Sequence, residues 1–274
     1  MRGTEGRGVR EHQSRPVDRG EPAFNAPAVV LASIALFAAI HLWRVFLSED
    51  ADIAVLLRFA FIPARYDPAS PYLPDMLGGE GAKVWTFLTY AFLHGDWTHL
   101  LVNSVAMLAF GSAVAWRFGS LRFLVFSALC AVGGAAAHLA LHIDEPQPVI
   151  GASAAISGQM AGAMRFMFEA GGPLGAFRRR GRPAFSAPAV PLATALRNPQ
   201  VLIFLLAWFG TNIAFGLGGM ALSGETASIA WEAHIGGFLT GLALFPLFDP
   251  KVARFRDRAD ASVALPPRPP APHD

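Results

Sequence analysis

The stretch GASAAISGQMAG, residues 151–162, carries no charged side chain and places Gly158 and Gly162 four residues apart. Small residues at this spacing let two helix backbones approach closely in lipid. The stretch AHIGGFLTG, residues 233–241, repeats the spacing with Gly237 and Gly241. The two stretches therefore predict two membrane helices that pack directly against each other.

Composition extends this prediction to the whole chain. Its 274 residues are 53% hydrophobic and only 15% charged, whereas soluble domains carry about 25% charge. Stretches of this hydrophobicity and length predict membrane helices. We therefore expect an all-α polytopic membrane protein, a six-helix bundle with a long outer loop, Ser48–Asp96, between the first two spans. The expected spans are Pro27–Leu47, Trp97–Ala115, Leu121–His142, Ser153–Phe168, Val201–Leu217 and Ala230–Phe248.

The distribution of Lys and Arg predicts the orientation. With a cytoplasmic N-terminus, 18 of the 22 Lys and Arg residues fall on the cytoplasmic side, as the positive-inside rule requires. Residues 1–26 are expected to form a disordered basic cytoplasmic tail, residues 27–248 the membrane domain, and residues 249–274 a Pro-rich cytoplasmic tail. We expect a bacterial inner-membrane protein with both termini in the cytoplasm.

Four polar residues, His99, Asn103, Ser153 and His234, lie near the starts of their apolar segments. In the predicted topology these segments, the second, fourth and sixth, all run from outside to inside. With a rise of about 1.5 Å per residue, His99, Ser153 and His234 lie in the outer third of the membrane, and Asn103 lies one turn below His99. Polar groups are costly in hydrocarbon and usually mark function there.

These residue types suit acyl-transfer chemistry. Ser153 is a candidate nucleophile and His234 the candidate general base that accepts its proton. Asn103, His99 and the backbone N–H of Ser153 are candidates to stabilise an oxyanion. Glu232 points to another face of its helix, so we expect a Ser–His dyad rather than a triad.

Other histidines have a plainer interpretation. His41, His138 and His142 are expected to be packing or interhelical hydrogen-bonding residues. His94 is expected in a loop, supporting the site indirectly. The sequence has no compact His/Glu motif, so no metal site is expected.

At these residues the sequence resembles the rhomboid family of intramembrane serine proteases. Residues 151–154 resemble the family's GxSx motif, and residues 233–241 resemble its AHxxGxxxG motif. His94, His99 and Asn103 resemble its H-x4-H-x3-N pattern. The resemblance covers residues 27–248. It implies a Ser153–His234 dyad with supporting or packing roles for four glycines, namely Gly151, Gly158, Gly237 and Gly241.

The resemblance also implies an endopeptidase that cuts single-pass membrane proteins in or near their transmembrane segment, with no cofactor. Its expected partners are these substrates and the lipid bilayer, not nucleic acid. The sequence departs from the family pattern at two positions: Ala154 follows the nucleophile where Gly is usual, and Trp85-Thr86 replaces the usual Trp-Arg.

Two other functions fit part of the pattern. A catalytically inactive rhomboid-like protein would bind or escort membrane clients, but the presence of both Ser153 and His234 favours an enzyme. A transporter would predict broken helices or a repeat between the halves of the chain. The sequence shows neither clearly.

Overall fold

The computed structural model describes residues 26–72, 74–177, 181–222 and 230–250. Regular structure in these ranges is helical, and their β-contact is one isolated bridge between Phe61 and Val149. The all-α prediction is therefore confirmed for this part of the chain. The predictions for the two tails fall almost wholly outside it.

Ten α-helices occur in the described residues. Their order is α1 Ala28–Val45, α2 Glu49–Phe59, α3 Ala82–Thr89, α4 Trp97–Ala106, α5 Ser112–Phe118, α6 Ser120–Leu141, α7 Ser153–Ala163, α8 Leu192–Ala195, α9 Pro199–Leu222 and α10 Trp231–Phe248. A π-helical turn, Met107–Gly111, joins α4 to α5. The segment between α1 and α4 contains α2, α3 and short 3-10 turns.

Three helical stretches in the described residues are long and apolar enough to cross a membrane: Ala28–Val45, Trp97–Phe118 and Ser120–Leu141. Pro199–Ala214 is apolar but shorter. The three spans support a membrane protein, and the count of six stays a prediction. The fourth segment differs most, because α7 ends at Ala163 and not near Phe168.

The early end of α7 coincides with a contact to a distant part of the sequence. The chain turns after Met164, and Arg165 pairs with Val190: its carbonyl accepts from the Val190 N–H at 3.0 Å, and its Nε donates to the Val190 carbonyl at 2.7 Å. These bonds hold the chain in a loop connected to residues far along the sequence. Helix periodicity in the sequence carries no signal for such a contact.

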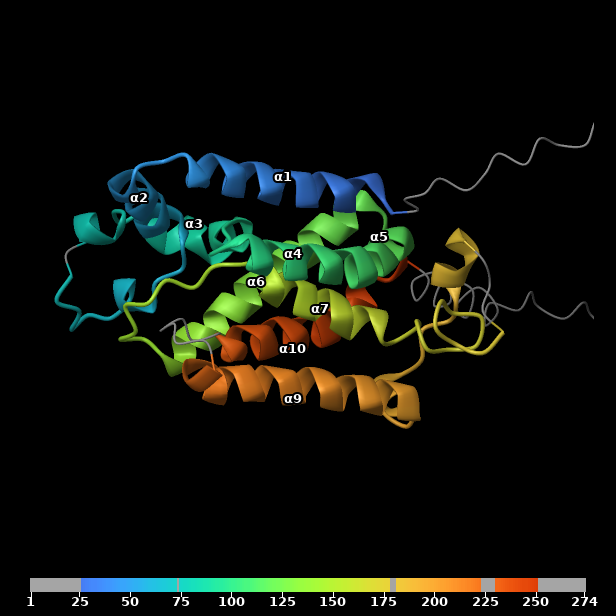
Figure 1. Cartoon of the computed structure of the whole chain (residues 1–274). Coiled ribbons are helices and arrows are strands. Elements are labelled where there is room, and N and C mark those ends of the chain that lie inside the picture. The colour runs from blue at the N-terminus through green and yellow to red at the C-terminus, as the bar shows by residue number, and fades with distance from the viewer. Residues whose placement is uncertain (1–25, 73, 178–180, 223–229, 251–274) are drawn as a thin grey trace, which may run out of the picture.

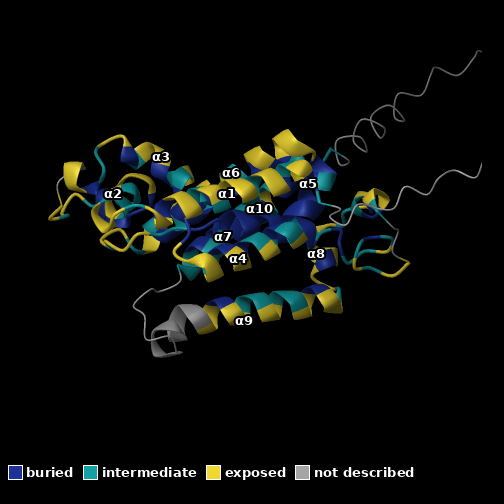
Figure 2. Ribbon diagram, turned by 45° about the horizontal axis from the view of Figure 1, so that its top comes forward, coloured by how far each residue is buried: buried dark blue, intermediate teal, exposed yellow. Residues whose placement is uncertain are grey.

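The helices form a bundle in which α6, α7 and α10 lie between α1 and α9 (Figure 1). Residues 154–163 of α7 are all buried, and Figure 2 shows the dark blue, buried residues gathered at the centre of the molecule around α7. By contrast, α1, α6 and α9 expose many large apolar side chains, including Leu36, Leu121 and Leu206. Such surfaces suit a lipid environment.

Direct backbone contact between α7 and α10 confirms the predicted pairing of the two glycine-containing stretches. A Cβ atom added at Gly237 would lie 2.1 Å from the Ala154 carbonyl oxygen, and one at Gly241 would lie 2.4 Å from that of Gly158. No larger residue fits at either position without moving a helix. The crossing brings together the N-terminal ends of α7 and α10.

Candidate active site

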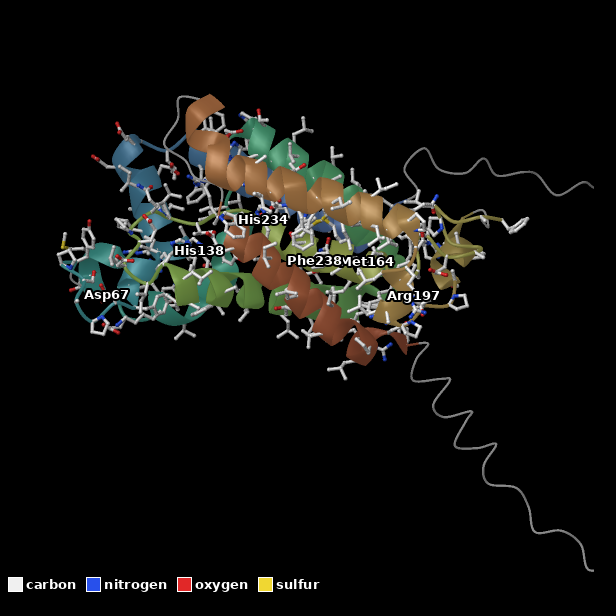
Figure 3. The ribbon with its side chains drawn as sticks, turned by 90° about the horizontal axis from the view of Figure 1, so that it is seen from below. Asp67, His138, Met164, Arg197, His234 and Phe238 are labelled. Carbon is white, nitrogen blue, oxygen red and sulfur yellow. The ribbon has the colours of Figure 1, made fainter. Side chains whose placement is uncertain are left out.

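The crossing of α7 and α10 brings Ser153 and His234 into contact. Ser153 is the first residue of α7, and His234 lies in the first turn of α10. The Oγ atom of Ser153 is 2.7 Å from Nε2 of His234, a distance suited to proton transfer between a nucleophile and its base. His234 lies near one end of α10, with Phe238 one turn further along (Figure 3).

Asn212, on α9, forms the third part of this constellation. Its side-chain Oδ1 accepts a hydrogen bond from Nδ1 of His234, and its Nδ2 donates to the Trp208 carbonyl at 2.8 Å. The amide nitrogen is thus engaged with α9, which directs the oxygen toward the imidazole. A proton held on Nδ1 leaves Nε2 free to accept the proton of Ser153.

Asn212 is the functional candidate that sequence reasoning missed. It is a lone buried amide in the apolar segment Val201–Leu217, which is the same signal that singled out Asn103. The prediction of a dyad without a third member considered only acidic residues as orienting groups. An amide oxygen serves equally well as a hydrogen-bond acceptor, and this one comes from a separate helix.

His99 lies beside the turn that leads into Ser153. Gly151 has a φ of +115°, and a Cβ atom added there would lie 2.6 Å from His99 Nε2 and 3.7 Å from Ser153 Oγ. Gly151 is required here because of both its left-handed backbone and this close approach. Its N–H donates to the Tyr90 carbonyl at 3.0 Å, which fixes the turn against the preceding segment.

Asn103 is buried one turn below His99 on α4. Its Nδ2 donates to the His99 carbonyl at 2.9 Å. The α4 helix is capped by Asp96, whose carboxylate accepts from the His99 N–H at 2.8 Å. The structure therefore groups His99 with Gly151 and Ser153. The oxyanion role of Asn103 remains a prediction.

His94 is fully buried in the loop before α4. Its ring lies against Phe37 and His99, with centroid distances of 5.4 and 5.2 Å. Burial, reinforced by the neighbouring His99 and His41, lowers the pKa of His94 to about 3. A neutral His94 thus packs against the His99 ring in the loop before α4, and its supporting role in the site stays a prediction.

Arg44, at the end of α1, fixes the loop that carries His94. Its Nη1 donates to the His94 carbonyl at 2.8 Å, and its other nitrogens bond both carboxylate oxygens of Asp52 on α2 at 2.7 and 2.9 Å. Arg44 is buried, and its bidentate pair with Asp52 connects α1, α2 and the loop before α4 close to the site.

The structure accommodates Ala154 after the nucleophile. A Cβ atom added at Gly134 of α6 would lie 2.5 Å from the Ala154 methyl group. Gly134 therefore provides the space that the methyl group fills, and Ala154 packs in a buried cluster with Ala131 and Ala233. The departure from the usual glycine is compensated on α6.

Thr86 is the second departure from the family pattern. Its hydroxyl accepts a hydrogen bond from a buried arginine at another position, Arg65. The guanidinium of Arg65 donates to Thr86 Oγ1 at 3.0 Å and to the carbonyls of Leu57, Ala60 and Leu77 at 2.7 to 3.2 Å. Burial lowers the pKa of Arg65. Arg65 thereby joins α2 to α3, so a buried arginine is present in this segment although position 86 lacks one.

The N-terminus of α7 completes the site. Backbone N–H groups in the first turn of a helix have no intrahelical acceptor and carry a partial positive charge. Ser153 occupies this turn, so an oxyanion formed on a carbonyl attacked by its Oγ would face these donors. The arrangement thus combines a candidate nucleophile, a candidate base held by a hydrogen bond, and free backbone donors.

Comparison with known proteins agrees with this arrangement. The Rhomboid domain family matches residues 81–250. The chain is 29% identical to the rhomboid protease GluP of Bacillus subtilis over 66% of this chain and 29% of that protein. It is 27% identical to the mitochondrial RHOMBOID-like protein 6 of Arabidopsis thaliana, over 85% of this chain and 73% of that protein.

RHOMBOID-like protein 2 of Arabidopsis thaliana is 26% identical over 80% of this chain and 64% of that protein. The chain thus spans less than a third of GluP and about two thirds or more of the two plant proteins. The family match extends over more than half of the chain and includes His99, Asn103, Ser153, Asn212 and His234. On this match and the helix packing above, the chain belongs to the rhomboid family.

Proposed function

We propose that this protein is an intramembrane serine endopeptidase that cleaves single-pass membrane proteins in or near their transmembrane segment. The observation that carries the proposal is the 2.7 Å contact between Ser153 Oγ and His234 Nε2, with Nδ1 of the same ring held by Asn212. A serine used only for packing would bond its own helix backbone, whereas Ser153 faces an oriented base.

In the acylation step, Ser153 Oγ attacks the scissile carbonyl carbon while His234 Nε2 accepts the hydroxyl proton. The carbonyl oxygen becomes an oxyanion stabilised by N–H groups at the start of α7, with Asn103 and His99 as side-chain donors. Each such donor contributes about 3 kcal/mol to transition-state stabilisation. The imidazolium then donates its proton to the leaving amine, and an acyl-enzyme remains on Ser153.

In the deacylation step, His234 accepts a proton from water, and the resulting hydroxide attacks the acyl carbon. Collapse of the second oxyanion expels Ser153 Oγ, which recovers its proton from His234. The chemistry balances with water as the only co-reactant. Because the base must be neutral, activity should fall on acidification, and a flat rate through the acid range would contradict His234 as base.

The proposed enzyme has six spans, both termini in the cytoplasm of a bacterial cell and its active site near the outer face of the inner membrane. The charge distribution supports this orientation. In this topology α7 enters below the membrane surface, so water reaches Ser153 from the outer side. Oxyanion donors from α4 and α7 then meet the substrate at one depth.

The test compares three forms of the purified full-length protein in detergent: wild type, Ser153→Ala and His234→Ala. Each is incubated with a model single-pass substrate, and cleavage is followed by electrophoresis and mass spectrometry of the products. We expect cleavage by the wild type alone. Cleavage that persists in both variants would refute the assigned dyad.

The second candidate is a catalytically inactive rhomboid-like protein that binds membrane clients. The two plant relatives are named rhomboid-like proteins and not rhomboid proteases, and this supports the second candidate. It predicts substrate co-purification without cleavage across a broad substrate panel, and identical client binding by wild type and Ser153→Ala.

A further inference from the structure

Three potential metal ligands converge beside the start of α10. His138 and His142 are one turn apart at the end of α6, and Glu232 is in the first turn of α10. Nε2 of His142 is 3.0 Å from one Glu232 carboxylate oxygen, and Nδ1 of His138 is 3.6 Å from the other. One ligand atom from each residue lies within 4.8 Å of the other two.

The cluster is largely removed from solvent. The His138 side chain is 8% exposed and that of Glu232 is 10% exposed. The Nδ1 atom of His138 faces Glu232 at 3.6 Å, and its Nε2 atom has no hydrogen-bond partner among the described residues. A buried imidazole nitrogen without a hydrogen-bond partner destabilises the fold, unless it binds a ligand such as a metal ion. His142 is 38% exposed, so one side of the cluster faces solvent.

The helices beneath the cluster are held at a fixed distance. A Cβ atom added at Gly236 of α10 would lie 2.3 Å from the Ala137 methyl group, and one at Gly133 of α6 would lie 2.0 Å from Thr240 Oγ1. This close contact fixes α6 against α10 directly beside the three ligands. Figure 3 shows His138 near the end of the bundle where α10 begins.

We propose that His138, His142 and Glu232 form a binding site for a divalent transition-metal ion of the zinc class. Two imidazoles and a carboxylate, with a fourth position open to water, suit Zn²⁺ and not the oxygen-binding Mg²⁺ or Ca²⁺. Two histidines at i and i+4 present their rings on one helix face, as zinc sites on helices require. The site was not expected from the sequence.

The spacing of the ligand atoms suits a small metal ion. Ligands on a tetrahedral Zn²⁺ at about 2.0 Å are separated by roughly 3.3 Å, and His142 and His138 lie 3.0 and 3.6 Å from the Glu232 oxygens. The bound ion would neutralise Glu232 and join α6 to α10 two residues before His234. The proposal does not depend on protease activity, because the predicted effect is on stability.

The experiment uses full-length untagged protein in detergent, treated with a chelator and then dialysed. Thermal unfolding is measured with added Zn²⁺, Co²⁺ or Mg²⁺. Zn²⁺ and Co²⁺ should raise the midpoint by about 5 °C at an ion concentration about 100 times the Kd, and Mg²⁺ should leave it unchanged. Bound Co²⁺ should also give the visible absorption of a tetrahedral nitrogen and oxygen site, with one ion per chain.

Two variants locate the site. Glu232→Gln and His142→Gln should abolish the Zn²⁺-dependent shift and the Co²⁺ absorption. Glu80→Gln, which changes an exposed carboxylate paired with Lys83, is the matched control and should retain both. His99→Gln tests whether the ion binds instead to the other histidine pair, His94 and His99.

The absence of a shift and of Co²⁺ absorption in the wild type would refute the site, whether or not the variants fold. Equal shifts in wild type, Glu232→Gln and His142→Gln would also refute it, as would loss of the shift in His99→Gln alone.

Discussion

Asn212 Oδ1 accepts a hydrogen bond from Nδ1 of His234, although the two residues lie on different helices. The bond links the base on α10 to α9, a helix on which Val201 and Asn212 are the only buried positions among residues 199–214. Trp208 stacks on Phe238 one turn away, with ring centroids 4.8 Å apart. The position of α9 therefore controls the orientation of the proposed base.

We expect Asn212→Ala to lower kcat about tenfold, with little change in KM. The lost hydrogen bond is worth about 1 to 1.5 kcal/mol and acts on the base and not on substrate binding. Cleavage kinetics on a single-pass substrate provide the measurement. Asn212→Asp, which keeps an acceptor oxygen, should lose less activity.

The neighbouring Thr211→Ala is the control for Asn212, because Thr211 is exposed and, among the described residues, its hydroxyl bonds only the Ala207 carbonyl of its own helix. It should keep the wild-type rate. An Asn212→Ala variant as active as Thr211→Ala would exclude an orienting role for the amide.

Gly237→Ala should destabilise the bundle by about 1 to 3 kcal/mol and lower activity in parallel. The new methyl group would overlap the Ala154 carbonyl, so α7 and α10 would separate and Ser153 would move from His234. Unfolding in a detergent series measures the stability. Gly210→Ala on α9 is the control, because no described residue lies within 4 Å of a Cβ atom placed there, and it should be neutral or slightly stabilising.

Acid should destabilise the fold through His94. Its pKa is about 3 in the folded protein and about 6.5 when unfolded, so the unfolded state binds more protons between these values. The free energy of unfolding should therefore fall as pH drops below about 6.5, by on the order of 1 kcal/mol per pH unit. His94→Gln should reduce the slope measured by equilibrium unfolding, and an unchanged slope would exclude His94 as its source.

Arg65→Met should loosen the segment between α1 and α4. The substitution removes four donated hydrogen bonds and leaves buried carbonyls unsatisfied, at a cost of several kcal/mol. Hydrogen exchange should rise in α2 and α3. Arg58→Met, at an exposed position of α2, is the matched control, and equal exchange in the two variants would argue against the network.

The contact at the centre of the bundle was predictable, because the residues that specify it follow a short, regular spacing within each helix. Glycines four residues apart specified the contact of α7 with α10, and charge placement put Ser153 and His234 at one depth. Their 2.7 Å contact agrees with both predictions. The ends of segments were less predictable: α7 stops early because Arg165 bonds Val190, a contact between distant residues.

Residues whose role depends on a second helix were assigned least well. Asn212 escapes sequence-based prediction because its partner lies across an interface with no charge or glycine signal. The sequence predicts packing or interhelical hydrogen bonding for His138 and His142, and the hydrogen bond from His142 to Glu232 agrees with this. That both histidines converge on Glu232 appears only once α6 packs on α10. Arg65 likewise bonds Thr86 from 21 positions away.

Covalent labelling with a fluorophosphonate tests the central claim most directly, because it needs no natural substrate. Attack by an activated serine forms a phosphorus–oxygen bond and expels fluoride. Peptide mass spectrometry of the labelled wild-type protein should locate the adduct on Ser153, and His234→Ala should label at a small fraction of that rate. Failure to label Ser153, or equal labelling in His234→Ala, would contradict a serine nucleophile activated by His234.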